Sequence, residues 1–281
     1  MQSFDKKRFY SYRADANALG GFLDEPFQKI IPTLAPVSLP AAGGFATARS
    51  EAFRLDETVS CASAYTQVTG RKSPKDDSHS ILVTAVVEGL NILEVVTAER
   101  IVAQISVTIP HEEGPWKVSF AGTHFEGLRL AGRPSVPKLN SDLHRPEGER
   151  RGQAAPLTWQ DMQRAGREQA KKLISCFKER GGEDAYQWAV HRHGWMTSDA
   201  QPGAGRALCS LVDGFEDSGP NTCYGHIVEI PGFGRIFLGE LLIFPDSVQL
   251  VSIRAELGCP LKGVVTGPTP AASGGGGGPD S

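Results

Sequence analysis

Recognisable catalytic motifs are absent from this sequence of 281 residues. It contains no Gly-x-Ser-x-Gly nucleophile turn, no Walker A phosphate loop and no Gly-x-Gly-x-x-Gly between a strand and a helix. Gly232 and Gly234 stand in a pattern typical of a β-hairpin turn. The glycines of residues 274–278 lack the lysine and the following helix that a phosphate loop requires. These absences favour a protein without catalytic activity, and we predict no cofactor.

An excess of charge of one sign is also missing. The 29 basic and 32 acidic residues leave a formal net charge of -3, which gives no overall attraction to a polyanion. Nucleic acid is therefore an unlikely partner, and a protein partner is the open alternative. A signal peptide would need an apolar stretch after the basic residues Lys6, Lys7 and Arg8, but Arg13 and Asp15 interrupt it, so we predict no export signal. We expect a cytoplasmic protein, with the cell surface or secretion by a non-classical route as the alternative.

Long apolar runs of membrane-spanning type are missing too. The longest uncharged stretch, residues 30–48, contains three prolines and the pair Gly43-Gly44. A lipid-embedded helix would tolerate these residues badly, so the stretch predicts extended chain and no transmembrane segment.

Cysteine is too sparse for a disulfide scaffold at this length. The number is odd, so at least one thiol is free or paired outside the chain, and small buried side chains are the expected role. A bridge between Cys209 and Cys223 stays open if the chain reaches an oxidising compartment. The five residues are Cys61, Cys176, Cys209, Cys223 and Cys259.

What the sequence does contain is strand-forming patterns. Residues 81–87 are a near-continuous apolar run, which predicts a strand covered on both faces. In residues 101–109 apolar and polar side chains alternate, which predicts one buried and one polar face. Residues 224–230 and 235–244 flank a Pro-Gly-Phe-Gly turn and predict a hairpin, and residues 248–257 add a strand. The fold class is therefore mainly β (α+β), an antiparallel sandwich-like or compact multi-sheet domain with one helical insertion. A short β-solenoid is the alternative.

One helix is strongly indicated. Thr158 followed by Asp161 has the spacing of a capping box, an apolar stripe follows at helical spacing, and Gly181-Gly182 ends it. A second short helix is expected from Glu183 to His191. We divide the chain into an extended N-terminal segment that packs on the core (1–50), a first β-rich half (51–132), a loop (133–156), the helical insertion (157–195), a second β-rich half (206–265) and a disordered Gly-rich tail (266–281).

A short repeated motif relates residues 87–92 to residues 125–130, which both contain Glu-Gly-Leu. Two copies indicate either stacked repeat units or two strands that use the same glycine kink.

The histidines are the first place to look for a metal. His191 and His193 flank Arg192 and are the weak candidate ligands. A zinc site needs a third and usually a fourth ligand, and only Asp199 is close in sequence, with Cys209 or His226 as candidates in space. Surface or helix-capping histidines are the competing interpretation.

Two glutamates invite comparison with a glycosidase. Glu229 and Glu240 lie on the two arms of the predicted hairpin, but Glu229 would face the region of Gly234 to Ile236. At about 3.3 Å per residue the two carboxylates would be more than about 10 Å apart, too far for the paired acids of such an enzyme. We therefore predict no catalytic residues.

Side chains of the helical insertion supply the interaction candidates. Its basic face could meet an acidic partner or nucleic acid, although a solvated face is the ordinary interpretation. Two tryptophans nearby could pack internally or form part of a partner surface. These candidates are Arg164, Arg167, Lys171, Trp188 and Trp195.

Several short motifs resemble those of the bacterial choice-of-anchor surface proteins. A Gly-Leu element (89–92) is followed by a Thr-Ala-Glu turn (96–99), and a second Gly-Leu element ends in glycine at residues 127–132. Further similar segments are residues 10–12, 16–20, 39–44 and 228–238. The resemblance implies a β-rich extracellular module, and it assigns no functional residue.

The sequence thus favours a non-enzymatic β-rich structural or interaction module. The alternative is a metal-binding protein or an enzyme that uses the region of His191 and His193.

Overall fold

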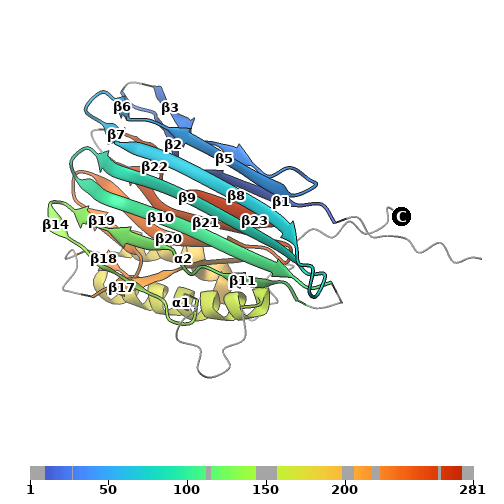
Figure 1. Ribbon diagram of the computed structural model, residues 1–281. Helices are drawn as coiled ribbons and strands as arrows, with labels where there is room; N and C mark the ends of the chain where they lie inside the picture. Colours follow the sequence, from blue (N-terminus) through green and yellow to red (C-terminus); the bar gives the residue numbers. More distant parts are fainter. Residues whose placement is uncertain are drawn as a thin grey trace, which may run out of the picture.

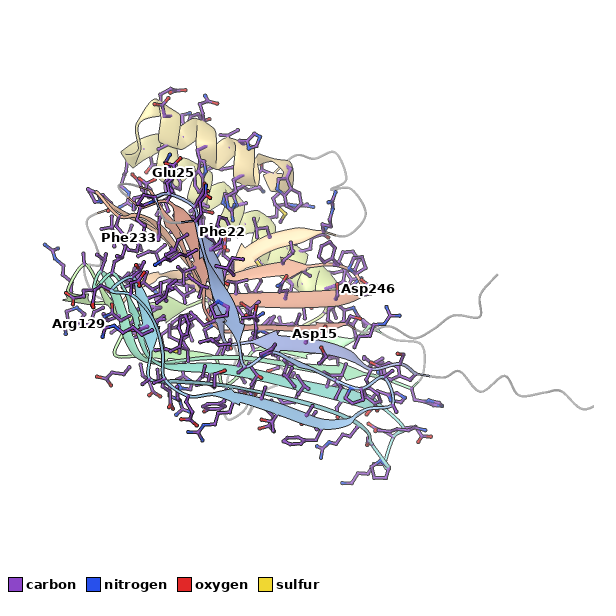
Figure 2. The ribbon with its side chains drawn as sticks, turned by 90° about the horizontal axis from the view of Figure 1, so that it is seen from above. Asp15, Phe22, Glu25, Arg129, Phe233 and Asp246 are labelled. Atoms are coloured by element: carbon purple, nitrogen blue, oxygen red, sulfur yellow. The ribbon has the colours of Figure 1, made fainter. Side chains whose placement is uncertain are left out.

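The computed structural model is built in three layers (Figure 1). It describes residues 10–26, 28–111, 115–143, 157–197, 206–216, 222–258 and 261–273. Two antiparallel sheets pack face to face, and two helices lie on the side of the first sheet that faces away from the second (Figure 2). The sequence-based expectation of a mainly β, sandwich-like domain with a helical insertion is therefore confirmed.

The first sheet runs in the order β18, β19, β20, β21, β22, β2 and β3, and four further strands attach to it. The expected hairpin is β19 and β20, in which Glu229 pairs with Arg235. The strands are β1 (Arg13–Asn17), β2 (Leu19–Leu23), β3 (Lys29–Leu34), β4 (Val37–Ser38), β16 (Ala207–Ser210), β18 (Cys223–Tyr224), β19 (Ile227–Ile230), β20 (Gly234–Ile243), β21 (Ser247–Leu257), β22 (Gly263–Thr266) and β23 (Thr269–Ser273).

The second sheet is organised around a long central hairpin. Its two strands, β9 (His79–Ile92) and β10 (Val96–Ile109), pair along nearly their whole length, and β8 and then β5 continue the sheet on the far side of β9. The other members are β5 (Gly44–Ser50), β6 (Phe53–Leu55), β7 (Val59–Cys61), β8 (Ser63–Lys72), β11 (Lys117–Ser119), β12 (His124–Glu126), β13 (Arg129–Leu130) and β14 (Arg133–Pro134). A separate pair joins β15 (Pro137–Leu139) to β17 (Val212–Phe215).

The main core lies between the two sheets. One part of it surrounds Ile81, Ile105 and Leu250, and an adjoining part surrounds Val87 and Ile253, all of them buried. Burying one aliphatic side chain of this size contributes about 1.5–3 kcal/mol. Because the sheets are sealed against each other in this way, the surfaces left for function are their outward faces and edges.

The helices α1 (Trp159–Arg180) and α2 (Glu183–Thr197) cover part of the outward face of the first sheet. The predicted capping box is confirmed, with Thr158 and Asp161 bonded reciprocally at the start of α1. Leu173 and Phe177 of α1 pack with Phe237 of β20 in a third, smaller core. The second helix is longer than predicted and ends at Thr197 instead of His191.

The repeated motif at residues 87–92 and 125–130 forms the same glycine kink twice. Gly89 and Gly127 both have φ near +60°, a conformation that favours glycine. The segments on either side of them pair with β10 from its two sides, with Glu88 and Glu126 both opposite Arg100. The two copies are therefore flanking strands of one sheet, and the solenoid alternative does not apply.

Three details differ from the sequence-based expectation. The tail expected from residue 266 forms strand β23, because Thr269–Ser273 bonds to β1 on one side and β21 on the other; residues 274–281 lie outside the described part. Residues 81–87 were expected to be covered on both faces, but Leu82 and Thr84 point outward and remain half-exposed. The expected loop at 133–156 contains β14 and β15, and its residues 144–156 are not described.

Among the described helices, none combines the length and the apolar character needed to cross a membrane.

Candidate functional site

The outward face of the second sheet is a broad surface that no described helix covers. The helices make their contacts with strands of the first sheet, and both views show the second sheet with its outer side bare (Figures 1 and 2). Strand alternation sends every second side chain to this face. We call the following outward side chains the platform: Thr47, Arg49, Ser63, Tyr65, Gln67, Thr84, Val86, Glu88, Arg100, Val102 and Gln104.

The platform side chains line up in rows across the strands. Thr47 of β5 is in register with Gln67 of β8, which is in register with Thr84 of β9 and then Gln104 of β10. A second row begins at Arg49 and passes through Tyr65. The rows exist because the strands pair in unbroken register and every second residue of each strand points to the same face.

Cross-strand bonds hold several platform side chains in place. The Gln104 side-chain amide donates to the Thr84 hydroxyl at 3.2 Å, and Arg100 donates to the Tyr65 hydroxyl at 2.7 Å. Ser63 donates to Glu88 at 2.7 Å. Groups fixed in this way lose less conformational entropy when a partner binds.

The charges of this face are balanced. Arg100 lies between Glu88 and Glu126 of the flanking strands, 3.7 Å from the Glu88 carboxylate. Its hydrogen bond to Tyr65 and the adjacent carboxylates hold the pKa of Arg100 above its ordinary value. A face with alternating charges has no electrostatic preference for a polyanion.

A second polar cluster lies under α2. Glu240 is 5% exposed and accepts ion pairs from Arg192 of α2 and Arg254 of β21, each at 2.7 Å. Both guanidinium groups also lie over the ring of Phe237, at 4.9 and 3.8 Å from its centre. Arg254 also pairs with Glu256. The carboxylate is thus neutralised from two sides, which is what allows it to be buried.

Two histidines border this cluster. His193 is 2% exposed and His226 is 3% exposed, and their ring centres lie 6.3 Å apart in an edge-to-face arrangement. Nε2 of His193 and Nδ1 of His226 are buried without a hydrogen-bond partner among the described residues. Burial is the main cause that lowers the pKa of each imidazole to about 3. The neighbouring His226 and Arg192 lower the pKa of His193 further, and Arg192 and Arg254 lower that of His226. Both imidazoles are therefore neutral at physiological pH.

The two candidate metal ligands on α2 do not converge. His191 and His193 are two positions apart on a helix, which places them about 200° apart around its axis, and His191 is exposed whereas His193 is buried. Asp199 lies outside the described residues. Within the described chain no three His, Cys, Asp or Glu residues are grouped so that they could hold a metal ion.

The interaction candidates of the helical insertion fall into different environments. Arg164 pairs with Asp161, and Lys171 pairs with Glu168 at 3.1 Å, so both charges have partners on their own helix. Arg167 is half-buried. Trp188 packs against Phe177 and Phe237, with the Arg235 guanidinium 4.1 Å from the centre of its ring. Trp195 is exposed, and its indole nitrogen donates to the Arg192 carbonyl at 2.9 Å.

The glutamates and cysteines are distributed as follows. Glu229 pairs with Arg235 at 2.7 Å and Glu240 with Arg254, so the two acids belong to different ion pairs. Cys209 and Cys223 are free thiols and do not form the bridge left open by the sequence. Burial raises the pKa of the Cys209 thiol to about 12, so it stays protonated and unreactive.

Two further features involve the N-terminal part of the described chain. The Tyr12 hydroxyl contacts Nδ1 of His79 at 2.8 Å while Tyr10 stacks on the same ring, which ties the N-terminal strands to the second sheet. A surface groove of about 260 Å³ lies between β1, β21 and β23. Asp15, labelled in Figure 2, is on its wall and accepts a 2.5 Å bond from Ser38.

Comparison with known families gives one match. A family model described as Domain of unknown function (DUF8256) matches residues 9–244. The chain belongs to this family. The match takes in the second sheet, the helical insertion, every platform residue and the strands of the first sheet up to β20, whereas β21, β22 and β23 follow residue 244. The platform is therefore part of the DUF8256 domain. No curated protein and no solved structure matches the chain significantly.

The residues of the polar cluster under α2 were not predicted from the sequence. Glu240 and Arg254 belong to neighbouring strands, and Arg192 comes from an insertion, so no sequence spacing links them. A charged residue within an otherwise apolar strand, as at Glu240, is the signal that could have found the cluster. Identifying the platform requires the register of the strands, because its residues are ordinary outward positions of alternating strands.

Proposed function

We propose that this protein is a non-enzymatic interaction module that binds a protein partner through the platform. The observation that carries the proposal is the bare outer face of the second sheet, opposite a first sheet whose outer face is partly covered by helices. A domain that covers one sheet and leaves the other open presents a broad, rigid surface. The resemblance to choice-of-anchor surface proteins is compatible with a binding role and stays a prediction.

The chemistry of the platform fits a protein surface better than other partners. Arg49 and Arg100 are offset by Glu88 and the neighbouring Glu126, whereas nucleic acid requires a basic patch. Tyr65 contributes a half-exposed aromatic ring with a polar end, and polar side chains of the platform surround it. Aromatic and apolar centres with polar rims are typical of protein interfaces.

The polar clusters outside the platform fit a structural role better than a catalytic one. Glu240 is held between two arginines, and the pKa of the neighbouring His193 is far below the physiological range. A general acid or base works best with a pKa close to the operating pH, and the pKa of His193 is far from it. The alternative of an enzyme or metal protein at His191 and His193 has the weaker support, since the two side chains point to different sides of α2.

Site-specific photo-crosslinking in the producing cell tests the proposal. A benzophenone amino acid at Gln67, an exposed platform residue, should give discrete adducts with a partner protein. The matched control carries the same group at Lys172, which is exposed on α1 on the other side of the molecule. Adducts from Lys172 alone, or equal adducts from both, would count against the platform. Substrate turnover that disappears on substitution of one polar residue would contradict a non-enzymatic role.

A further inference from the structure

The strand edges of this protein are unequally protected. A free edge presents unpaired amide and carbonyl groups to other chains, and natural proteins protect such edges with proline, shortness, bulges or a covering element. In the first sheet, β3 carries Pro32 and a register shift against β2. At the opposite margin β16 packs against α1, and β18 has only two residues, with Arg180 donating to the Cys223 carbonyl at 2.5 Å.

The second sheet has one protected margin and one unprotected margin. On the β10 side the sheet ends in the short segments β11, β12 and β13, of two or three residues each. On the other side it ends in the three-residue β6 and in β5, whose seven residues pair with β8 in unbroken register and with no other described strand. The strand contains no proline, and Arg49 is its only charged residue. Phe45 on this edge is 60% exposed.

The sequence of β5 is complementary to itself when two copies run antiparallel. The register that overlaps all seven residues, Gly44–Ser50, places Thr47 opposite Thr47 of the other copy. On the outward face Phe45 then lies opposite Arg49, twice by symmetry, which allows the guanidinium to contact the ring. On the inward face Ala46 lies opposite Ala48. No like charges oppose each other in this register, and Thr–Thr and aromatic pairs across strands are favourable.

We propose that β5 pairs with β5 of a second copy of this chain, joining two second sheets into one continuous sheet. The occupant is a second copy because the exposed aromatic and the single charge complement each other about the centre of the strand. The pairing also doubles the area of the platform without covering it. The inference concerns assembly, and it stands whether or not the platform binds a protein.

Charge substitutions on neighbouring strands test this assembly. The oligomeric state of the full chain is measured by sedimentation and native mass spectrometry between about 1 and 200 μM. We expect a dimer for the natural chain. Thr47→Lys places two lysines opposite each other at the centre of the interface and should raise the dimer Kd about tenfold or more. Gln67→Lys is the matched control, because Gln67 is the register neighbour of Thr47 on the same face but one strand further in.

The outcomes separate edge pairing from other arrangements. Dissociation by Thr47→Lys and not by Gln67→Lys supports the proposal. Equal dissociation by both indicates that the faces associate, and a monomeric natural chain or a dimer that resists Thr47→Lys excludes edge pairing; each of these results overturns the proposal. An oxidised Thr47→Cys variant adds an independent readout, because directly opposed strand residues have Cα atoms about 4.5–5.5 Å apart, within disulfide range. It should form a covalent dimer that Gln67→Cys does not form.

Discussion

Acidification from pH 7 to pH 5 should lower the free energy of unfolding of this protein through the two histidines under α2. The folded state holds His193 and His226 neutral, with a pKa of about 3 for each, against an ordinary value of 6.5. Because the pKa is lower in the folded state, the unfolded chain binds more protons below pH 6.5. The free energy of unfolding is therefore at its full value above pH 6.5 and decreases as the pH falls from 6.5 toward 3.

The size of the effect follows from the distance between the pH and the unfolded pKa. One pH unit corresponds to about 1.36 kcal/mol per group, so each histidine lowers the free energy of unfolding by roughly 2 kcal/mol at pH 5. Together they remove roughly 4 kcal/mol, a large part of the 5–15 kcal/mol typical of a domain. The groups that face the two rings are Arg192, Arg254 and Glu240, and the two arginines oppose protonation. Asp161, whose pKa is lowered from 3.8 by its capping bonds to Thr158, contributes only at lower pH.

Urea denaturation at pH 7.0, 6.0 and 5.0 measures this dependence directly. The double variant His193→Gln, His226→Gln should lose most of the pH dependence, although its stability at pH 7 changes as well. His191→Gln is the matched control, since His191 lies two residues away on the same helix and is exposed, and it should retain the full dependence. A natural chain that loses less than about 1 kcal/mol between pH 7 and pH 5, or a double variant that loses as much as the natural chain, would refute the reasoning.

Three substitutions test other parts of the structure by thermal or urea denaturation. Glu240→Ala leaves two half-buried arginines without their shared partner and should cost about 3–5 kcal/mol, and a loss below about 1 kcal/mol would show that the cluster is solvated. Gly89→Ala forces a φ of +60° on a residue with a Cβ only 2.9 Å from that of Ala62, so we expect a loss of about 1–2 kcal/mol or more, and an unchanged midpoint would contradict the kink. Thr158→Ala removes the cap of α1 and should cost about 1 kcal/mol, while an equal loss for Thr158→Ser would argue against a capping role.

Local patterns predicted the local elements of this fold correctly. The capping box of α1, the hairpin of β19 and β20, and the pairing of Glu229 near Arg235 follow from residues within about ten positions of each other. The apolar alternation in residues 101–109 identified which side of β10 is buried. Such features depend on the chain's own backbone periodicity, which a single sequence displays.

Those local patterns could not predict the pairing of strands that lie far apart in the sequence. Strand β23 has the sequence Thr-Pro-Ala-Ala-Ser, which has little strand propensity, and it is ordered because β1 and β21 bond to it on both sides. The continuous apolar run at 81–87 could not indicate that one face of β9 stays open, because its outward residues include the apolar Val86, which neighbouring side chains bury. The cluster around Glu240 depends on where the helical insertion packs, and no spacing in the sequence encodes that position.

The binding affinity of a partner recovered through the Gln67 crosslink is the most direct test of the central claim, that the open face of the second sheet is the functional surface. Tyr65→Ala and Arg100→Ala remove two bonded platform side chains, and the account predicts that each weakens binding by about tenfold or more without loss of the folded state. Arg164→Ala on α1 should leave the affinity unchanged. Full affinity in both platform variants, together with a loss in Arg164→Ala, would contradict the account.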